Sequence, residues 1–217
     1  MVAPVNRMML LADRSVVEGS QVASLEGIRI WTDKDRLPDS ARTSSRKHEN
    51  SHWSNHRLHT ACSRLPASEY FASRPSFFGS IHAHLDHNVF VDWLYLERLT
   101  GKRFLPDDVG DLLHREFAPL AEDQLAAGRA LIDFCRNATP DTLGSMVTFG
   151  LSDGTQYTEV VSSVLAHLFV HQIHHRGQVH DMISATSVPP PQPDEFFMSA
   201  DLPLREKELK SLGLPIV

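Results

Sequence analysis

Four long stretches of the chain place apolar residues at helical spacing, and each is bounded by residues that commonly end helices. The last stretch shows the period most clearly, at Val161, Val164, Leu165, Leu168, Phe169, Ile173, Val179 and Ile183. We therefore expect helices over residues 48–65, 76–100, 111–137 and 159–186. Four amphipathic helices joined by short links predict an all-α, up-and-down four-helix bundle.

Smaller features complete this pattern. Runs of β-prone residues on either side of Asp153-Gly154 predict a small β-hairpin before the last bundle helix, because this dipeptide favours tight hairpin turns. Pro119 either bends the third helix or lies near its true beginning. Four prolines between residues 189 and 193 end the fourth helix, and a short helix is expected near residues 202–212.

The first 46 residues differ from the remainder, because charges interrupt their short apolar clusters and no sustained period appears. We expect residues 1–46 to be an N-terminal extension that is loosely ordered or results from a start codon assigned too far upstream. Residues 47–217 are expected to form a single domain, since the chain is long enough for one core and short for two.

Candidate chemistry is concentrated between residues 167 and 180, which hold five of the thirteen histidines. His167, His171 and His175 follow one another at intervals of four, so they occupy adjoining turns of one helix face. Two imidazoles at this spacing can bind one metal ion, and a site of three histidines leaves a coordination position for water or substrate. A histidine-rich polar face would show the same spacing, so a third ligand from another helix is required.

Two other groups of histidines are candidates for that ligand. His48, His52 and His56 are also four residues apart, but we expect them to be solvated polar groups at the irregular start of the first helix. The second predicted helix carries His82, His84 and His87 beside its apolar stripe. Because metal sites in helical bundles use inward side chains of facing helices, this helix is the better source of the third ligand.

Composition excludes several classes of function. A formal net charge of −6 argues against nucleic acid as a partner, because such binding relies on clustered lysine and arginine. The two cysteines lie outside any paired motif, which is typical of a reducing compartment, and we expect a cytoplasmic protein. No apolar run approaches the ~18 residues of a membrane span, so no membrane association is expected.

The second and fourth predicted helices also carry paired motifs, namely Phe77-Phe78-Gly79-Ser80-Ile81 with Leu85-Asp86-His87 and Asp92, and the run from His167 to Gln178. In this order and at this distance, the motifs resemble the DinB/YfiT-like family of bacterial metal-binding four-helix proteins. That family is distinct from the DNA polymerase that shares the DinB name. The similarity also includes residues 53–58 and the tail at 189–197, so it extends over residues 46–217.

The resemblance implies a specific site and assembly. By matching positions, His87, His171 and His175 would be the three ligands of a divalent metal ion, for which nickel and zinc are the leading candidates. Family members often form homodimers, and some relatives are transferases or isomerases that depend on a low-molecular-weight thiol. The resemblance implies no substrate and no catalytic residue for this chain.

Other histidines near these positions keep alternative roles open. His167 is a candidate fourth ligand or proton shuttle, and His84 is the reserve ligand on the second helix. His174 points about 100° away from His175 around the helix axis, so it is expected to bond elsewhere or to face solvent.

Polar residues between the histidines suggest further contacts. Arg176 is expected to form a structural ion pair with Asp92 or Glu97. Asp86 or Asp92 is a candidate to orient a ligand imidazole, and a position at the surface is an equal alternative for both. Gln172 occupies the position at which the peptidase motif HExxH requires a glutamate base, so the chain is not expected to be a metallopeptidase.

Two functional hypotheses follow. The first is a metal-dependent transferase or hydrolase, in which a thiol or water occupies the open metal position. The second is a non-catalytic metal- or ligand-binding protein of a stress response. An open pocket over the metal with a converging acid, base or anion-binding group would favour the enzyme, whereas a sealed site would favour binding alone.

Overall fold

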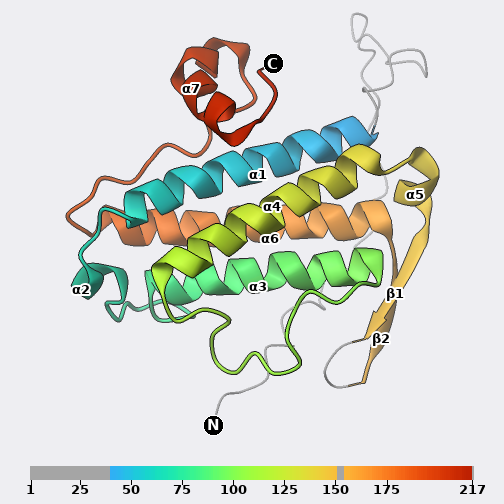
Figure 1. Ribbon diagram of the computed structural model, residues 1–217, viewed down its shortest axis with the longest axis horizontal. Helices are drawn as coiled ribbons and strands as arrows, with labels where there is room; N and C mark the ends of the chain where they lie inside the picture. The colour runs from blue at the N-terminus through green and yellow to red at the C-terminus, as the bar shows by residue number, and fades with distance from the viewer. Residues whose placement is uncertain (1–39, 151–153, 217) are drawn as a thin grey trace, which may run out of the picture. The chain divides into compact units, whose positions relative to one another are not determined.

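The computed structural model describes residues 40–150 and 154–216, and these residues are mainly helical (Figure 1). The helices are α1 (Ser40–Cys62), α2 (Ala67–Tyr70), α3 (Ile81–Thr100), α4 (Phe117–Asn137), α5 (Pro140–Gly144), α6 (Val161–Ser184), the 3-10 helix η2 (Ser199–Asp201) and α7 (Leu202–Leu212). Strands β1 (Met146–Gly150) and β2 (Gln156–Val160) pair antiparallel, with Thr148 opposite Thr158. The predicted helical class and the hairpin before the last long helix are therefore confirmed.

The first helix begins earlier than its apolar pattern indicated. It starts at Ser40 rather than at residue 48, so the predicted boundary after residue 46 falls inside α1. Buried positions in this part of the helix are polar: Ser45 is buried, and its hydroxyl donates to the Glu49 carboxylate at 3.2 Å. A hydrophobic period does not reveal polar burial of this kind. Most of the predicted extension lies outside the described residues.

Local capping explains where α3 and α4 begin. Ser80 ends the loop before α3 by accepting a hydrogen bond from the Ala83 backbone N–H at 3.1 Å, so α3 starts at Ile81 rather than at residue 76. Helix α4 starts at Phe117 rather than at residue 111, which places Pro119 in its first turn, where its missing N–H costs no helical hydrogen bond. Residues 101–116 consequently form a long connection that becomes part of the site.

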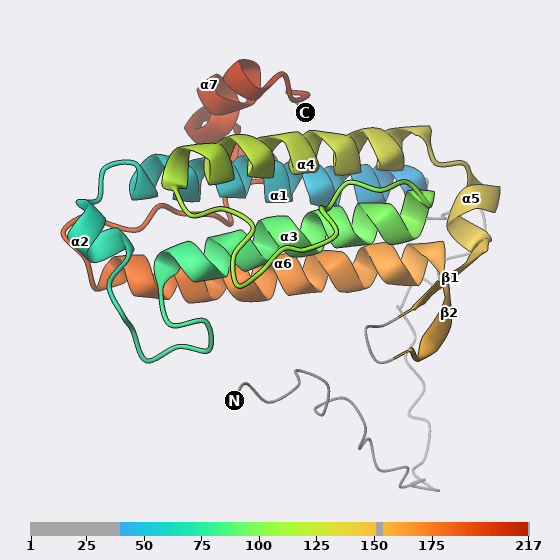
Figure 2. The same ribbon diagram turned by 60° about the horizontal axis from the view of Figure 1, so that its bottom comes forward.

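The four long helices pack side by side, as Figures 1 and 2 show. Helices α1 and α3 each contact both α4 and α6, and one apolar cluster draws on all four, through Leu58, Leu85, Leu120 and Ile183. Full burial of each such side chain contributes about 1.5–3 kcal/mol. Within the described ranges, no helix is both long and apolar enough to cross a membrane.

The tail beyond the fourth long helix is attached to α1. Trp53 of α1 is fully buried against Phe196 and Leu209, and its indole N–H donates to the Glu208 carboxylate at 2.6 Å. Arg57, one turn further along α1, donates to the same carboxylate at 2.8 Å. The predicted short helix near residues 202–212 is therefore confirmed as α7, which lies above α1 in Figure 1.

Candidate metal centre

His87 of α3 and His171 and His175 of α6 face one another across the contact between the two helices. Each offers one ligand nitrogen, and the three nitrogens lie within 4.8 Å of one another. The Nε2 atoms of His87 and His171 are 3.1 Å apart. One ion bound by two imidazoles at about 2.0–2.1 Å separates their nitrogens by roughly 3.3 Å, so the spacing fits a shared divalent ion.

The environment of these three residues, here called the histidine triad, keeps the imidazoles neutral. Burial lowers the pKa of His87 and His175 to about 4 and that of His171 to about 3. Nearby histidines reinforce the effect, since a positive charge on one ring would repel a second. Because a metal ligand must present a free lone pair, the donor set suits a divalent ion at neutral pH.

Two neighbouring side chains contact the rings of His87 and His175. The Nδ1 atom of His175 lies 2.8 Å from Oε1 of Gln178, so an Nδ1–H donor leaves Nε2 available to a metal. Phe78 stacks on His87 with ring centroids 4.2 Å apart and also contacts the His175 ring. No role was expected for Gln178, although its position three residues after His175 on one helix was a usable signal.

The orienting role expected of Asp86 is wrong. Its two carboxylate oxygens accept the backbone N–H groups of Leu113 at 2.8 Å and His114 at 2.7 Å. This buried carboxylate thus ties the connection between α3 and α4 back onto α3, one residue before His87. Asp86 also lies 3.3 Å from the His114 ring, so it positions a wall of the site rather than an imidazole of the triad.

Asp92 is not an imidazole partner either, because it lies at the centre of a buried amide network. It accepts hydrogen bonds at 2.7 Å from Gln124 of α4 and from Gln172 of α6, and burial raises its pKa to about 7. Arg176 is buried nearby and is attracted to Asp92 electrostatically, but its Nη1 has no hydrogen-bond partner among the described residues. The expected direct ion pair is therefore replaced by the two glutamine contacts.

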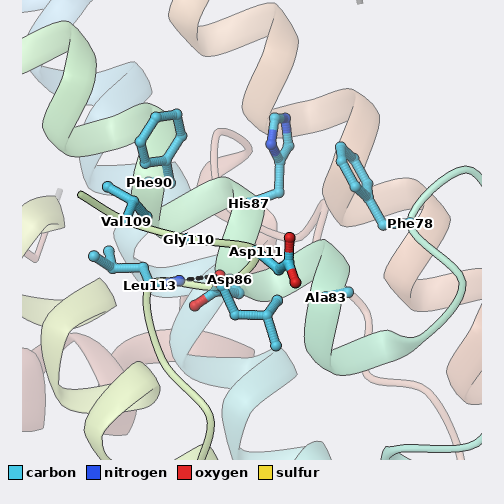
Figure 3. Close-up of a pocket in the computed structure, with 10 residues that line it drawn as sticks. Phe78, Ala83, Asp86, His87, Phe90, Val109, Gly110, Asp111 and Leu113 are labelled. Carbon is cyan, nitrogen blue, oxygen red and sulfur yellow. Dashed lines mark hydrogen bonds between the residues drawn. The ribbon is translucent and has the colours of Figure 1, made fainter. Parts of the chain in front are cut away.

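A pocket of about 430 Å³ borders the triad at His87, and we call it the His87 pocket (Figure 3). It is lined by Phe78, Ala83, Asp86, His87, Phe90, Val109, Gly110, Asp111, Leu112 and Leu113. These residues come from the loop before α3, from α3 itself and from the connection to α4. The volume is in the range of about 300–1,000 Å³ that small-molecule sites occupy.

Three other histidines near the triad do not join it as ligands. His167 is exposed and stacks on Tyr95, with ring centroids 5.9 Å apart and nearly parallel planes. His84 is fully buried, and its Nδ1 lies 2.9 Å from the Ser80 carbonyl oxygen. His174 is exposed, as expected. None of these belongs to the group that could hold a metal within the described part of the chain.

The histidines of α1 do not form a second metal group among the described residues, but the reason we expected is wrong. His48 and His52 are buried rather than solvated. Since α1 starts at Ser40, they lie in the middle of the helix and not at an irregular start. Neither ring nitrogen of His52 has a hydrogen-bond partner in the part of the chain that the structure describes. A Cβ on Gly128 of α4 would lie 2.4 Å from His52 Nδ1, so the glycine makes room for this ring.

Comparison with known proteins agrees with this arrangement. No curated protein matches the chain at the significance required. The DinB family profile matches residues 45–206, a span that contains the four long helices from the second turn of α1 onward and the whole histidine triad. Since the match extends over well more than half of the sequence, the chain belongs to the DinB family.

Proposed function

We propose that this protein is a metal-dependent enzyme that holds one divalent ion, nickel or zinc, through His87, His171 and His175. Three neutral imidazoles converging from two helices are the observation that carries the proposal. Such an ion would act as a Lewis acid and lower the pKa of a bound water or thiol. The reaction class that follows is group transfer or hydrolysis.

The His87 pocket favours an enzyme over a protein that only stores a metal. A binding-only site has no need of an adjoining cavity, whereas this cavity reaches one of the three ligands directly. Phe78 covers the triad on one side by stacking on His87, which limits access of water from that direction. The pocket also contains the carboxylate of Asp111, so a titratable group converges on the same space.

The fold supports the same interpretation. We infer that α1, α3, α4 and α6 form an up-and-down four-helix bundle, in which inward side chains of facing helices commonly build metal sites. The Asp92 network joins α3 and α6, which carry the triad, to each other and to α4. A rigid interior of this kind keeps three ligands in place without the ion.

A low-molecular-weight thiol is the co-substrate or ligand that we propose for the open position, because thiolates bind nickel and zinc well. We also propose a homodimer. The outer face of α6 supports it, since Val170 is 65% exposed and Ile173 is 47% exposed. The family match itself specifies neither a thiol nor any other substrate.

Metal analysis of protein purified without chelator tests the proposal. We expect one nickel or zinc ion per chain, and an increase in melting temperature when low-molecular-weight thiols are added to the metal-loaded protein. Protein stripped of metal should show no such increase. The proposal would be refuted if the purified protein contains no stoichiometric metal and also binds none when nickel or zinc is added.

A further inference from the structure

The His87 pocket carries an unbalanced charge. Its lining includes two carboxylates, Asp86 and Asp111, and no lysine or arginine. The other walls are mainly apolar, with the rings of Phe78 and Phe90 on either side of His87 in Figure 3. A ligand in this space therefore meets aromatic surface and negative charge, and no lysine or arginine of the lining.

The two carboxylates have different roles. Asp86 is buried, and both of its oxygens already accept backbone N–H groups from the connection between α3 and α4. Asp111 is exposed at the surface of the pocket and has no side-chain hydrogen bond or ion pair among residues 40–150 and 154–216. Figure 3 shows its carboxylate pointing to the same side as the His87 side chain. Asp111 thus supplies the uncompensated charge of the pocket.

The position of Asp111 is set by its neighbours. The adjacent Gly110 adopts φ +60°, a left-handed conformation that favours glycine, and this turns the chain between Val109 and Asp111. Two residues further on, the Leu113 N–H is held by Asp86. The loop is therefore anchored on α3 immediately beside the ligand His87, and it presents the Asp111 carboxylate to the same cavity.

Charge and surface together select a ligand class. Aromatic walls favour an apolar or aromatic body, and aromatic faces also attract cations. A carboxylate in a cavity lined by no lysine or arginine attracts a protonated amine and repels a second anion. A metal bound at the triad would attract an anionic group at one end of the ligand. Selection between different ligands would therefore depend on the charge at the end away from the metal.

We propose that Asp111 is a specificity-determining residue, and that the site takes a small apolar or aromatic molecule with a protonated amino group. This inference rests on the proposed metal-dependent function. Molecules that carry a carboxylate or phosphate at the same end are disfavoured. The triad anchors one end of the ligand, the phenylalanine rings contact its body, and Asp111 recognises the amine at the other end.

Matched aryl thiols test the inference on the full chain loaded with cobalt, whose thiolate coordination is seen by absorption spectroscopy. The probes are 4-mercaptobenzylamine and 4-mercaptobenzoate, which share a thiol and a ring and differ in the sign of the distal charge. Dissociation constants of both are measured in the native protein, in Asp111→Asn and in Asp111→Lys. The ratio of the two constants within one protein, compared between proteins, cancels the intrinsic difference between the thiols.

We expect the native protein to favour the amine, and Asp111→Asn to reduce that preference by about two- to fivefold, as for an exposed charge pair. Asp111→Lys should shift the ratio further, by roughly tenfold in total, because attraction becomes repulsion. The effect should shrink at high salt. Asp133→Asn is the control, since it removes the same charge from α4 outside the pocket lining and should leave the ratio unchanged.

The possible failures can be told apart. If both thiols bind cobalt and the ratio is the same in native protein, Asp111→Asn and Asp111→Lys, the inference is wrong and the metal site stands. If neither thiol changes the cobalt spectrum, the triad offers no exchangeable position. The proposed function then fails, and the inference fails with it. Circular dichroism of each variant verifies that an exposed loop substitution has left the helices intact.

Discussion

His171 and His167 of α6 show that two histidines one turn apart can have different surroundings. The Nε2 atom of His171 lies 3.1 Å from that of His87, whereas His167, one turn earlier, stacks on Tyr95 away from the triad. Spacing along the helix makes the two residues equivalent, and the angular drift of about 40° per four residues separates them. The position of His87 on α3 therefore decides that His171, and not His167, joins the triad.

Replacing His171 with alanine should abolish stoichiometric metal binding, because water replaces a lost imidazole poorly. His87→Ala and His175→Ala should have nearly the same effect, since the three residues form one site. His167→Ala is a matched control on α6 and should retain one ion per chain. Isothermal titration with nickel or zinc measures the stoichiometry. Loss of the ion in His167→Ala alone would show that the metal site is not the histidine triad.

Stability should depend on pH through the buried histidines of α1. Burial lowers the pKa of His48 and His52 from 6.5 to about 4, and nearby arginines add to the effect. Above pH 6.5 both folded and unfolded states hold these rings neutral, so the stabilising contribution is complete. As pH falls from 6.5 toward 4, the unfolded chain binds protons that the folded chain does not. Stability should then fall by at most about 1.4 kcal/mol per pH unit for each ring.

Urea unfolding of the metal-free protein between pH 7.5 and 4.5 measures this dependence. The triad contributes in the same direction, so the comparison is made between native protein and the variant His48→Gln/His52→Gln. The variant should show a shallower decline, because glutamine does not titrate. Equal slopes in the two proteins would mean that the α1 histidines take up protons in the folded state.

At the scale of elements, the buried carboxylate of Asp92 joins α3 to both of its neighbours. It accepts one hydrogen bond from Gln124 on α4 and one from Gln172 on α6, each at 2.7 Å. Gln172 and Arg176 each follow a histidine of the triad directly in sequence. The network therefore constrains the rotation of α6 that directs His171 and His175 toward His87.

Asp92→Ala should lower the free energy of unfolding by about 1–3 kcal/mol, because it leaves two buried amide donors without an acceptor. Metal binding should also weaken by about tenfold as the setting of α6 loosens. Asp92→Asn is the matched control: it keeps a side-chain carbonyl of the same size, and both losses should be smaller. Denaturant unfolding and metal titration report the two effects, and equal behaviour of the two variants would contradict the role of the hydrogen bonds.

The elements also differ in how well the sequence predicts them. Helix α6 departs from its predicted range by only two residues at each end, because its apolar period and the following prolines are local signals. The start of α1 was misplaced because its buried positions are polar, including Ser45 and Glu49. The Glu49 carboxylate is satisfied within α1 by Ser45 and Arg46. It also accepts from Arg136 of α4 at 2.9 Å, which is a contact between distant parts of the chain.

At the scale of the whole molecule, the proposed homodimer can be tested through the exposed face of α6. Val170 and Ile173 are large apolar side chains in contact with solvent, a placement that favours a partner surface. The native protein should be a dimer by light scattering at micromolar concentration, and Val170→Asp/Ile173→Asp should be a monomer. Leu204→Asp, on the exposed side of α7, is the control and should remain dimeric. A monomeric native protein would end the proposal.

The sequence alone determined the features that depend on neighbours along the chain. These are the helical class, the hairpin, the placement of His171 and His175 on one face, and the absence of the glutamate that a metallopeptidase needs. Helical periodicity and turn preferences act over a few residues, so they can be read directly. The choice of His87 as third ligand came from family resemblance, because spacing left His82 and His84 equally available.

The tertiary structure decided everything that depends on residues distant in sequence. It buried His48 and His52 instead of exposing them, and it used Asp86 to fold a loop over His87 and form the pocket. It also gave Asp92 two glutamine partners in place of an arginine. The reason is that polar side chains satisfy burial only through specific long-range partners, and a one-dimensional pattern of polar and apolar residues does not contain those pairings.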